Sequence, residues 1–128
     1  MFEPAKTVLI VEDDRDVREI ALAVLEAEGY RVLEAASGEE ALRLLIARPD
    51  LQVDVLFTDV VMPGRVDGFD LASEARRLRP DLLVLYATGF ANLVRDHRDS
   101  ELQGPLLRKP YRPGELRRAV TALLEHIE

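Results

Sequence analysis

Cysteine is absent from the 128-residue chain, so the sequence offers neither a disulfide framework nor a thiolate metal site. Long apolar runs are also absent, because runs such as 20–25 and 82–87 fall far short of the roughly 18 residues of a membrane span. The first residues, MFEPAK, lack the charged-then-apolar layout of a signal peptide. These absences favour a cytoplasmic protein that is not associated with a membrane.

Basic residues are outnumbered, since 17 lysines and arginines face 24 aspartates and glutamates and give a net charge of −7. Such a chain lacks the basic face that nonspecific nucleic-acid binding requires, so no direct nucleic-acid partner is expected. Lysine is scarce and occurs only at Lys6 and Lys109. In a chain that otherwise uses arginine, a lysine at a special position indicates a need for its compact point charge.

The apolar pattern alternates between strands and helices along the chain. Apolar runs predict five strands, at 7–11, 30–36, 53–58, 82–87 and 105–109. The segments after the first, second, third and fifth strands carry the one-sided apolar stripe of a helix, whereas 90–103 is a poor helix candidate. The alternation predicts one α/β domain over residues 1–128, with a doubly wound parallel sheet and helices on both faces.

Two local patterns predict helix starts. Asp14 precedes the helix that carries Val17 and Ile20, and a short acidic side chain at this place is typical of an N-cap. Further along, Ser37 is followed three residues later by Glu40, which predicts a capping box.

Polar side chains follow four of the five predicted strands: Glu12, Asp13 and Asp14 after the first, Asp59 after the third, Thr88 after the fourth and Lys109 at the end of the fifth. In an open parallel sheet, ligands bind outside the carboxyl ends of the strands. The sequence therefore predicts that carboxylates, a hydroxyl and an ammonium group meet at one edge.

This set of groups indicates phosphate chemistry. Two carboxylates about 5 Å apart repel by roughly 3 kcal/mol at an effective dielectric constant near 20, and a hard divalent cation such as Mg²⁺ removes the problem. Asp59 is the natural acceptor of a phosphoryl group, because a carboxylate can act as a nucleophile towards phosphorus. Thr88 and Lys109 are placed to hold further phosphate oxygens.

Four motifs then resemble one known family. LIVEDD, LFTDVVMPG, ATG and LLRKP stand in order at strand ends, and together they are similar to the receiver domain of two-component response regulators over essentially the whole chain. The resemblance implies the flavodoxin-like (βα)5 fold with strand order 2-1-3-4-5. It also implies a switch that takes a phosphoryl group from a histidine kinase, a histidine phosphotransfer protein or a small phosphodonor. Beyond its own phosphorylation and dephosphorylation, such a domain is not a turnover enzyme.

The resemblance also implies a role for each site residue. Asp59 is the phosphoacceptor, Asp13 binds Mg²⁺ directly, and Glu12 acts partly through water. The backbone carbonyl of Val61 is the third protein ligand of the metal. Thr88 supplies the switch hydroxyl. Lys109 contacts the phosphoryl oxygens, and its bond to Pro110 is cis in the family.

Three features depart from the family pattern. Leu106 stands three residues before Lys109, where the family often has the tyrosine or phenylalanine that swings inward on activation. The loop MPGRVDG is one residue longer than the commoner form, as in receivers of hybrid histidine kinases and some stand-alone receivers. Val61 and Phe90 are both apolar, so neither can orient an attacking water, and we expect spontaneous dephosphorylation to be slow.

Three other protein classes use related sites or folds. A haloacid dehalogenase-type phosphatase needs a second aspartate two residues after the nucleophile, where this chain has Val61. A degenerate receiver that acts as a constitutive docking module would lack one of the acids, the threonine or the lysine, and all are present. A dinucleotide-binding domain is disfavoured because no G-x-G-x-x-G follows the first strand. We expect either a single-domain regulator, monomeric or weakly dimeric, that binds an unidentified downstream protein, or a receiver excised from a longer protein.

Overall fold

The computed structural model describes residues 5–89 and 102–125. The strands in this part of the chain are β1 (Thr7–Val11), β2 (Arg31–Ala35), β3 (Val55–Asp59), β4 (Leu83–Thr88) and β5 (Leu106–Arg108). The helices are α1 (Arg15–Ala27), α2 (Gly38–Ala47), α3 (Gly68–Leu78) and α5 (Pro113–Glu125). The poor helix candidate of the sequence lies largely at 90–101, outside the described residues.

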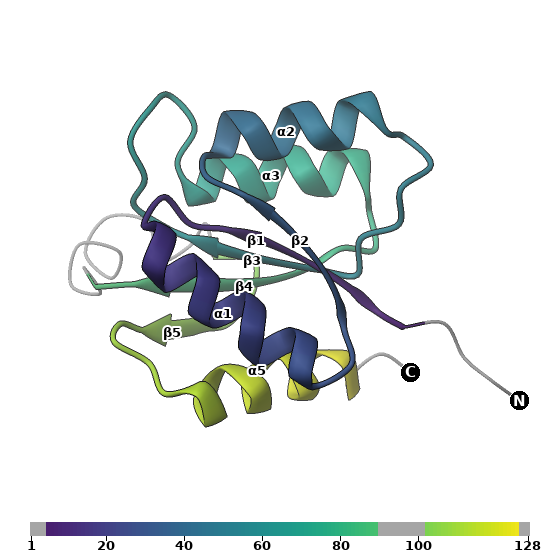
Figure 1. Cartoon of the computed structure of the whole chain (residues 1–128). Coiled ribbons are helices and arrows are strands. Elements are labelled where there is room, and N and C mark those ends of the chain that lie inside the picture. Colours follow the sequence, from purple (N-terminus) through teal and green to yellow (C-terminus); the bar gives the residue numbers. More distant parts are fainter. Residues whose placement is uncertain (1–4, 90–101, 126–128) are drawn as a thin grey trace, which may run out of the picture.

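The five strands form one parallel sheet in the order β2-β1-β3-β4-β5, which confirms the predicted flavodoxin-like topology. Helices α2 and α3 cover one face, and α1 and α5 cover the other (Figure 1). The chain reverses its direction across the sheet between β1 and β3, and this is the switch point at which α/β sheets bind ligands.

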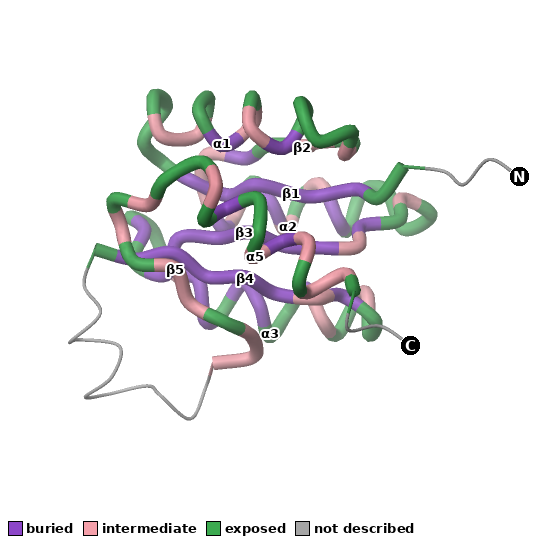
Figure 2. The backbone as a smooth tube through the Cα atoms, turned by 90° about the horizontal axis from the view of Figure 1, so that it is seen from below, coloured by how far each residue is buried: buried purple, intermediate pink, exposed green. Residues whose placement is uncertain are grey.

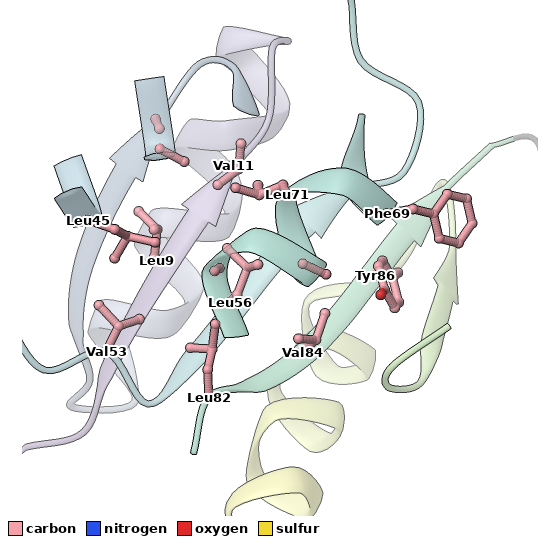
Figure 3. Packing of buried hydrophobic residues seen from close by; sticks show 14 of the residues in the cluster. Leu9, Val11, Leu45, Val53, Leu56, Phe69, Leu71, Leu82, Val84 and Tyr86 are labelled. Carbon is pink, nitrogen blue, oxygen red and sulfur yellow. The ribbon is translucent and has the colours of Figure 1, made fainter. Parts of the chain in front are cut away.

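Strands β1 and β3 lie inside the sheet and are buried along their whole length, as Figure 2 shows. Because side chains alternate in a strand, Leu9 and Val11 pack towards α2 and α3, whereas Val8 and Ile10 pack towards α1 and α5. Figure 3 shows the first of these two clusters, with Leu56 beneath α3. Burial on both faces explains why these strands appear in the sequence as continuous apolar runs.

The helix starts agree with the sequence at α1 and differ at α2. Asp14 caps α1, and its side chain accepts hydrogen bonds from the backbone N–H groups of Asp16 and Val17 at 2.9 and 3.2 Å. Ser37 accepts the N–H of Glu40 at 3.1 Å as predicted, but the Glu40 carboxylate accepts the N–H of Ala36 at 3.0 Å instead of that of Ser37. The reciprocal half of the predicted capping box is therefore displaced by one residue.

A complete capping box begins α3 instead, where Asp67 is the N-cap and Asp70 stands at the third helical position. An aspartate fills the place that glutamate or glutamine usually takes, so the usual sequence pattern does not reveal it. None of the described helices is long and apolar enough to cross a membrane.

Candidate functional site

The structure brings the predicted site residues together at the carboxyl edge of the sheet. Asp59 and Thr88 are the last residues of β3 and β4, and Lys109 directly follows β5. The strand register pairs Asp59 with Ala87 and Thr88 with Arg108, so the ends of the three strands are adjacent. Glu12 and Asp13 leave the end of β1 beside them, because Val11 pairs with Thr58.

Three carboxylates form the acidic part of the site. One oxygen each from Glu12, Asp13 and Asp59 lies within 4.8 Å of the other two, an arrangement that could hold a metal ion. Glu12 and Asp59 are only 6% and 8% exposed, whereas Asp13 is exposed. Two of the acids are thus almost removed from water and the third faces it. Hard oxygen donors, one of them open to solvent, suit Mg²⁺, which keeps several of its waters.

The Lys109 ammonium group bridges the two buried acids. Its Nζ donates to Oε1 of Glu12 at 2.6 Å and to Oδ2 of Asp59 at 2.9 Å. Burial by itself lowers the pKa of Lys109, but the hydrogen bonds to Glu12 and Asp59 outweigh it and hold that pKa above its usual value. Lys109 is therefore a fixed positive charge inside the site.

One ammonium group does not compensate the acids fully. Burial raises the pKa of Glu12 and that of Asp59 above their usual values, even though hydrogen bonds from Lys109 act in the opposite direction. The charge of Asp59 adds to the rise at Glu12, and that of Asp13 adds to the rise at Asp59. Unrelieved negative charge remains, which a divalent cation is suited to offset.

Thr88 is fully buried at the end of β4, and its backbone carbonyl accepts the N–H of Lys109 at 2.9 Å. On the other side, the N–H of Val60, next to Asp59, donates to the carbonyl of Ala87 at 3.0 Å. The end of β4 is thus tied both to the aspartate and to the lysine of the site.

Among the remaining predicted positions, the structure describes Val61, Leu106 and Pro110. Val61 is 40% exposed, with an apolar side chain where a dehalogenase-type phosphatase requires its second acid. The peptide bond between Lys109 and Pro110 is cis, the isomer that the resemblance implies. Leu106 is half-buried against the core beneath α3 and adds no ring, and Phe90 lies outside the described residues.

Tyr111 supplies an aromatic ring near the site at a different place. It packs edge-on against Phe57, with the ring centroids 5.8 Å apart. Burial, followed by the charge of Glu12, raises the pKa of Tyr111 to about 12, so the phenol stays neutral at physiological pH.

Gly68 is a site residue that the sequence did not reveal. A Cβ atom here would stand 2.3 Å from the carbonyl oxygen of Asp59 and 2.7 Å from the Cα of Val60. The N–H of Gly68 also donates to the carbonyl of Val60 at 2.8 Å. Only glycine lets α3 begin directly behind the end of β3, and this contact fixes the backbone of Asp59. An aspartate–glycine pair before an apolar helix was the available signal.

Glu39 is a second residue whose role the sequence did not reveal, and it holds the long loop after β3. Its carboxylate accepts the N–H of Arg65 at 2.8 Å, and this bond is the main reason why the pKa of Glu39 is lowered. The neighbouring Gly64 adopts a φ of 101°, a conformation that side chains other than glycine rarely take. The extra loop residue is thus accommodated by a contact with the start of α2, 26 positions away.

An apolar groove of about 320 Å³ adjoins the site. It is lined by Val17 and Ile20 of α1 and by the segment Lys109–Tyr111 that follows β5. The side chain of Ile20 is 57% exposed and gives the groove an apolar surface that is open to solvent.

Comparison with known proteins agrees with this geometry. Residues 8–121 match the model of the response regulator receiver domain. The chain is 33% identical over 120 residues to the response regulator receiver protein CpdR of Brucella abortus, covering 93% of this chain and 97% of that protein. It is 36% identical over 120 residues to the sensor kinase CckA of the same organism, where it covers 93% of this chain but only 12% of the kinase.

A solved structure of similar shape is the response regulator protein TrrA of Thermotoga maritima in complex with Mg²⁺-BeF. It is 28% identical to this chain, has a TM-score of 0.77, and the match covers 92% of this chain and 98% of that one. Receiver domains are in general signalling switches that interact with histidine kinases or phosphotransfer proteins. The chain belongs to the response regulator receiver domain family.

Proposed function

We propose that the chain is a cytoplasmic signalling switch in which Asp59 accepts a phosphoryl group from a phosphohistidine. One observation carries the proposal: the Asp59 carboxylate lies 2.9 Å from the Lys109 ammonium group and within 4.8 Å of oxygens of Glu12 and Asp13. An anionic phosphoryl group can approach a carboxylate in these surroundings only because positive charge, such as that of Lys109, lies beside it.

In the proposed reaction, a carboxylate oxygen of Asp59 forms the new bond to phosphorus. The phosphorus–nitrogen bond of the phosphohistidine breaks, and its electron pair stays on the imidazole nitrogen. Lys109 neutralises phosphoryl oxygens, and the Thr88 hydroxyl donates to one of them. Asp13, Asp59 and the Val61 carbonyl, with Glu12 acting partly through water, would hold Mg²⁺, which would supply the remaining positive charge.

The apolar groove is the proposed contact for the phosphodonor protein. Transfer requires the reacting atoms to approach within about 3–3.5 Å, so the donor must cover the sheet edge and the surface next to it. The groove adjoins Lys109 and exposes Ile20, and it therefore fits an apolar face of the helix that carries the phosphohistidine.

The docking step is tested by comparing two donors. With Ile20→Ser, transfer from a phosphorylated histidine phosphotransfer domain active on the wild-type chain should slow, whereas uptake from acetyl phosphate should be unchanged. Ile46→Ser is the matched control, because Ile46 is 64% exposed on α2, on the opposite face of the sheet. Equal slowing in both variants would contradict the groove as the docking surface.

The phosphoacceptor is tested by mass spectrometry after incubation with acetyl phosphate and Mg²⁺. Wild-type protein should gain one phosphoryl group, and Asp59→Asn should gain none. Asp50→Asn, an exposed aspartate at the far end of the sheet, controls for the loss of a carboxylate and should behave like wild type. Uptake that survives Asp59→Asn would refute the assignment.

A further inference from the structure

Arg18 of α1 connects the acidic site to the edge strand of the sheet. Its Nη1 donates to the backbone carbonyl of Glu12 at 2.8 Å, and its Nε donates to the carboxylate of Glu34 on β2 at 2.9 Å. The side chain is 17% exposed, so the guanidinium group is largely enclosed. These contacts place Arg18 against the main chain of the acidic pair.

The turn that carries the acids is held at each of its peptide groups. The N–H of Glu12 donates to the carbonyl of Ala35 on β2 at 3.1 Å. The carbonyl of Glu12 is held by Arg18, and the N–H of Asp14 donates to the Glu12 carboxylate at 3.0 Å. The peptide groups on both sides of Asp13 are therefore fixed.

The orientation of the Asp13 side chain depends on this backbone more than that of the Glu12 side chain does. The Glu12 carboxylate is placed by Lys109 and by the N–H of Asp14. Within residues 5–89 and 102–125, by contrast, the exposed Asp13 carboxylate has no hydrogen-bonding partner of its own. The main chain on either side therefore fixes the direction of its Cα–Cβ bond, and Arg18 holds one of those two sides.

We infer that Arg18 is a positioning residue for the metal site: by fixing the Glu12–Asp13 peptide group it aims the Asp13 carboxylate at the ion shared with Asp59. The inference rests on the proposed function, because it concerns the metal of that site. Outer partners that orient metal ligands are often worth 10–100-fold in metal affinity. Since Arg18 acts on the backbone and not on a ligand atom, we expect the lower end of this range.

The test is Mg²⁺ affinity, measured by isothermal titration calorimetry, in Arg18→Met and Arg15→Met. Arg15 lies on the same helix, and its replacement changes the net charge by the same amount. Among the described residues it pairs only with Glu19, at 3.0 Å, and its side chain is 79% exposed. Arg18→Met should weaken Mg²⁺ binding about tenfold, whereas Arg15→Met should bind Mg²⁺ as well as wild type or slightly better.

The direction of the change in Mg²⁺ affinity separates a positioning role of Arg18 from an effect of its charge. Removing a positive charge near the acids can only strengthen cation binding, so weaker binding in Arg18→Met must come from the lost contact. Glu34→Gln removes the anchoring charge of Arg18 while keeping Arg18 itself, and it should weaken binding less than Arg18→Met. Because it also removes a negative charge, which weakens cation binding by itself, Glu19→Gln is its charge control and should weaken binding less than Glu34→Gln. Glu34→Gln also provides the test if Arg18→Met fails to fold, as thermal unfolding without metal would show.

Three results would overturn the inference. Equal Mg²⁺ affinity in Arg18→Met and Arg15→Met would do so, and so would equal affinity in Glu34→Gln and Glu19→Gln where Arg18→Met does not fold. Absence of Mg²⁺ binding by the wild-type chain would overturn both this inference and the metal of the proposed function. Failure of the phosphoacceptor assignment is separate, because phosphoryl uptake by Asp59→Asn does not depend on Arg18.

Discussion

The replacement Lys109→Met tests how the acidic site is stabilised. Methionine keeps most of the volume of the lysine side chain but removes the ammonium group that contacts Glu12 at 2.6 Å and Asp59 at 2.9 Å. The variant leaves two carboxylates that are 6% and 8% exposed without their common counter-ion. The only other lysine of the chain, Lys6, is exposed, so Lys6→Met is the matched control.

The magnitude follows from the spacing of the acids. Carboxylate oxygens of the two acids lie within 4.8 Å of each other, and two charges at that separation repel by about 3.5 kcal/mol at an effective dielectric constant of 20. Breaking a buried ion pair by removing one partner costs about 3–5 kcal/mol. Because Lys109 is 23% exposed and water can enter, we expect a loss of about 3 kcal/mol in the free energy of unfolding. This is a large part of the 5–15 kcal/mol that is typical of a domain.

Urea denaturation at neutral pH in a chelating buffer measures this loss. Mg²⁺ should restore part of the stability, by about 1.4 kcal/mol at ten times its dissociation constant. In an Asp59→Asn background the same replacement should cost much less, because the main repulsion is gone. A loss below about 1 kcal/mol, or an equal loss in both backgrounds, would refute the view that Lys109 compensates the buried acids.

Three further predictions concern metal, packing and pH. Mg²⁺ should raise the melting temperature of the wild-type chain, and Asp13→Asn should remove most of that rise in a thermal unfolding experiment. Gly68→Ala should lower the free energy of unfolding by about 1–3 kcal/mol in urea titrations, since its Cβ would stand 2.3 Å from the Asp59 carbonyl oxygen. With Glu39→Gln, the urea concentration at the unfolding midpoint should fall less steeply as pH is lowered into the acid range. The folded state lowers the pKa of Glu39 through the Arg65 N–H, so its stabilisation is present above the unfolded pKa of about 4.3 and is lost as pH falls below it. A decline as steep as that of wild type would contradict this.

The convergence of the site was predictable because it follows from topology. Once β1, β3, β4 and β5 are known to be parallel, their carboxyl ends must meet, and whatever follows them is brought together. The separate roles of the three acids in LIVEDD were predictable in part. The helix cap at Asp14 is a local feature, and the structure confirms it. The metal roles of Glu12 and Asp13 remain predictions.

Contacts between distant segments were not predictable in the same way. Arg18 meets Glu34 across 16 positions, and Glu39 meets Arg65 across 26. Each pair consists of ordinary charged residues, which in a sequence are typical of a solvated helix face. The pair Asp67–Gly68 indicates a helix start, but the close approach of α3 to the end of β3 at Gly68 is visible only in the structure. Residue type and spacing therefore predicted the groups that carry charge, but not the groups that hold the backbone beneath them.

Charge balance explains how a site without an aromatic residue at position 106 can still act as a switch. With all groups ionised, three carboxylates and one ammonium group leave a net charge of −2. In the proposed reaction, the single charge of Asp59 is replaced by the nearly double charge of a phosphoryl group. That group competes with Glu12 for Lys109, which is shared between both acids in this structure.

Any shift of Lys109 towards the phosphoryl group acts on the edge of the sheet. The backbone N–H of Lys109 donates to the carbonyl of Thr88, and Lys109 directly follows β5. A movement of Lys109 therefore affects the pairing of β4 with β5. This coupling needs only a lysine, a buried acid and a shared strand edge. Leu106, at the start of β5, lies on the element that would move, and a swinging ring there is an addition to this mechanism rather than a requirement for it.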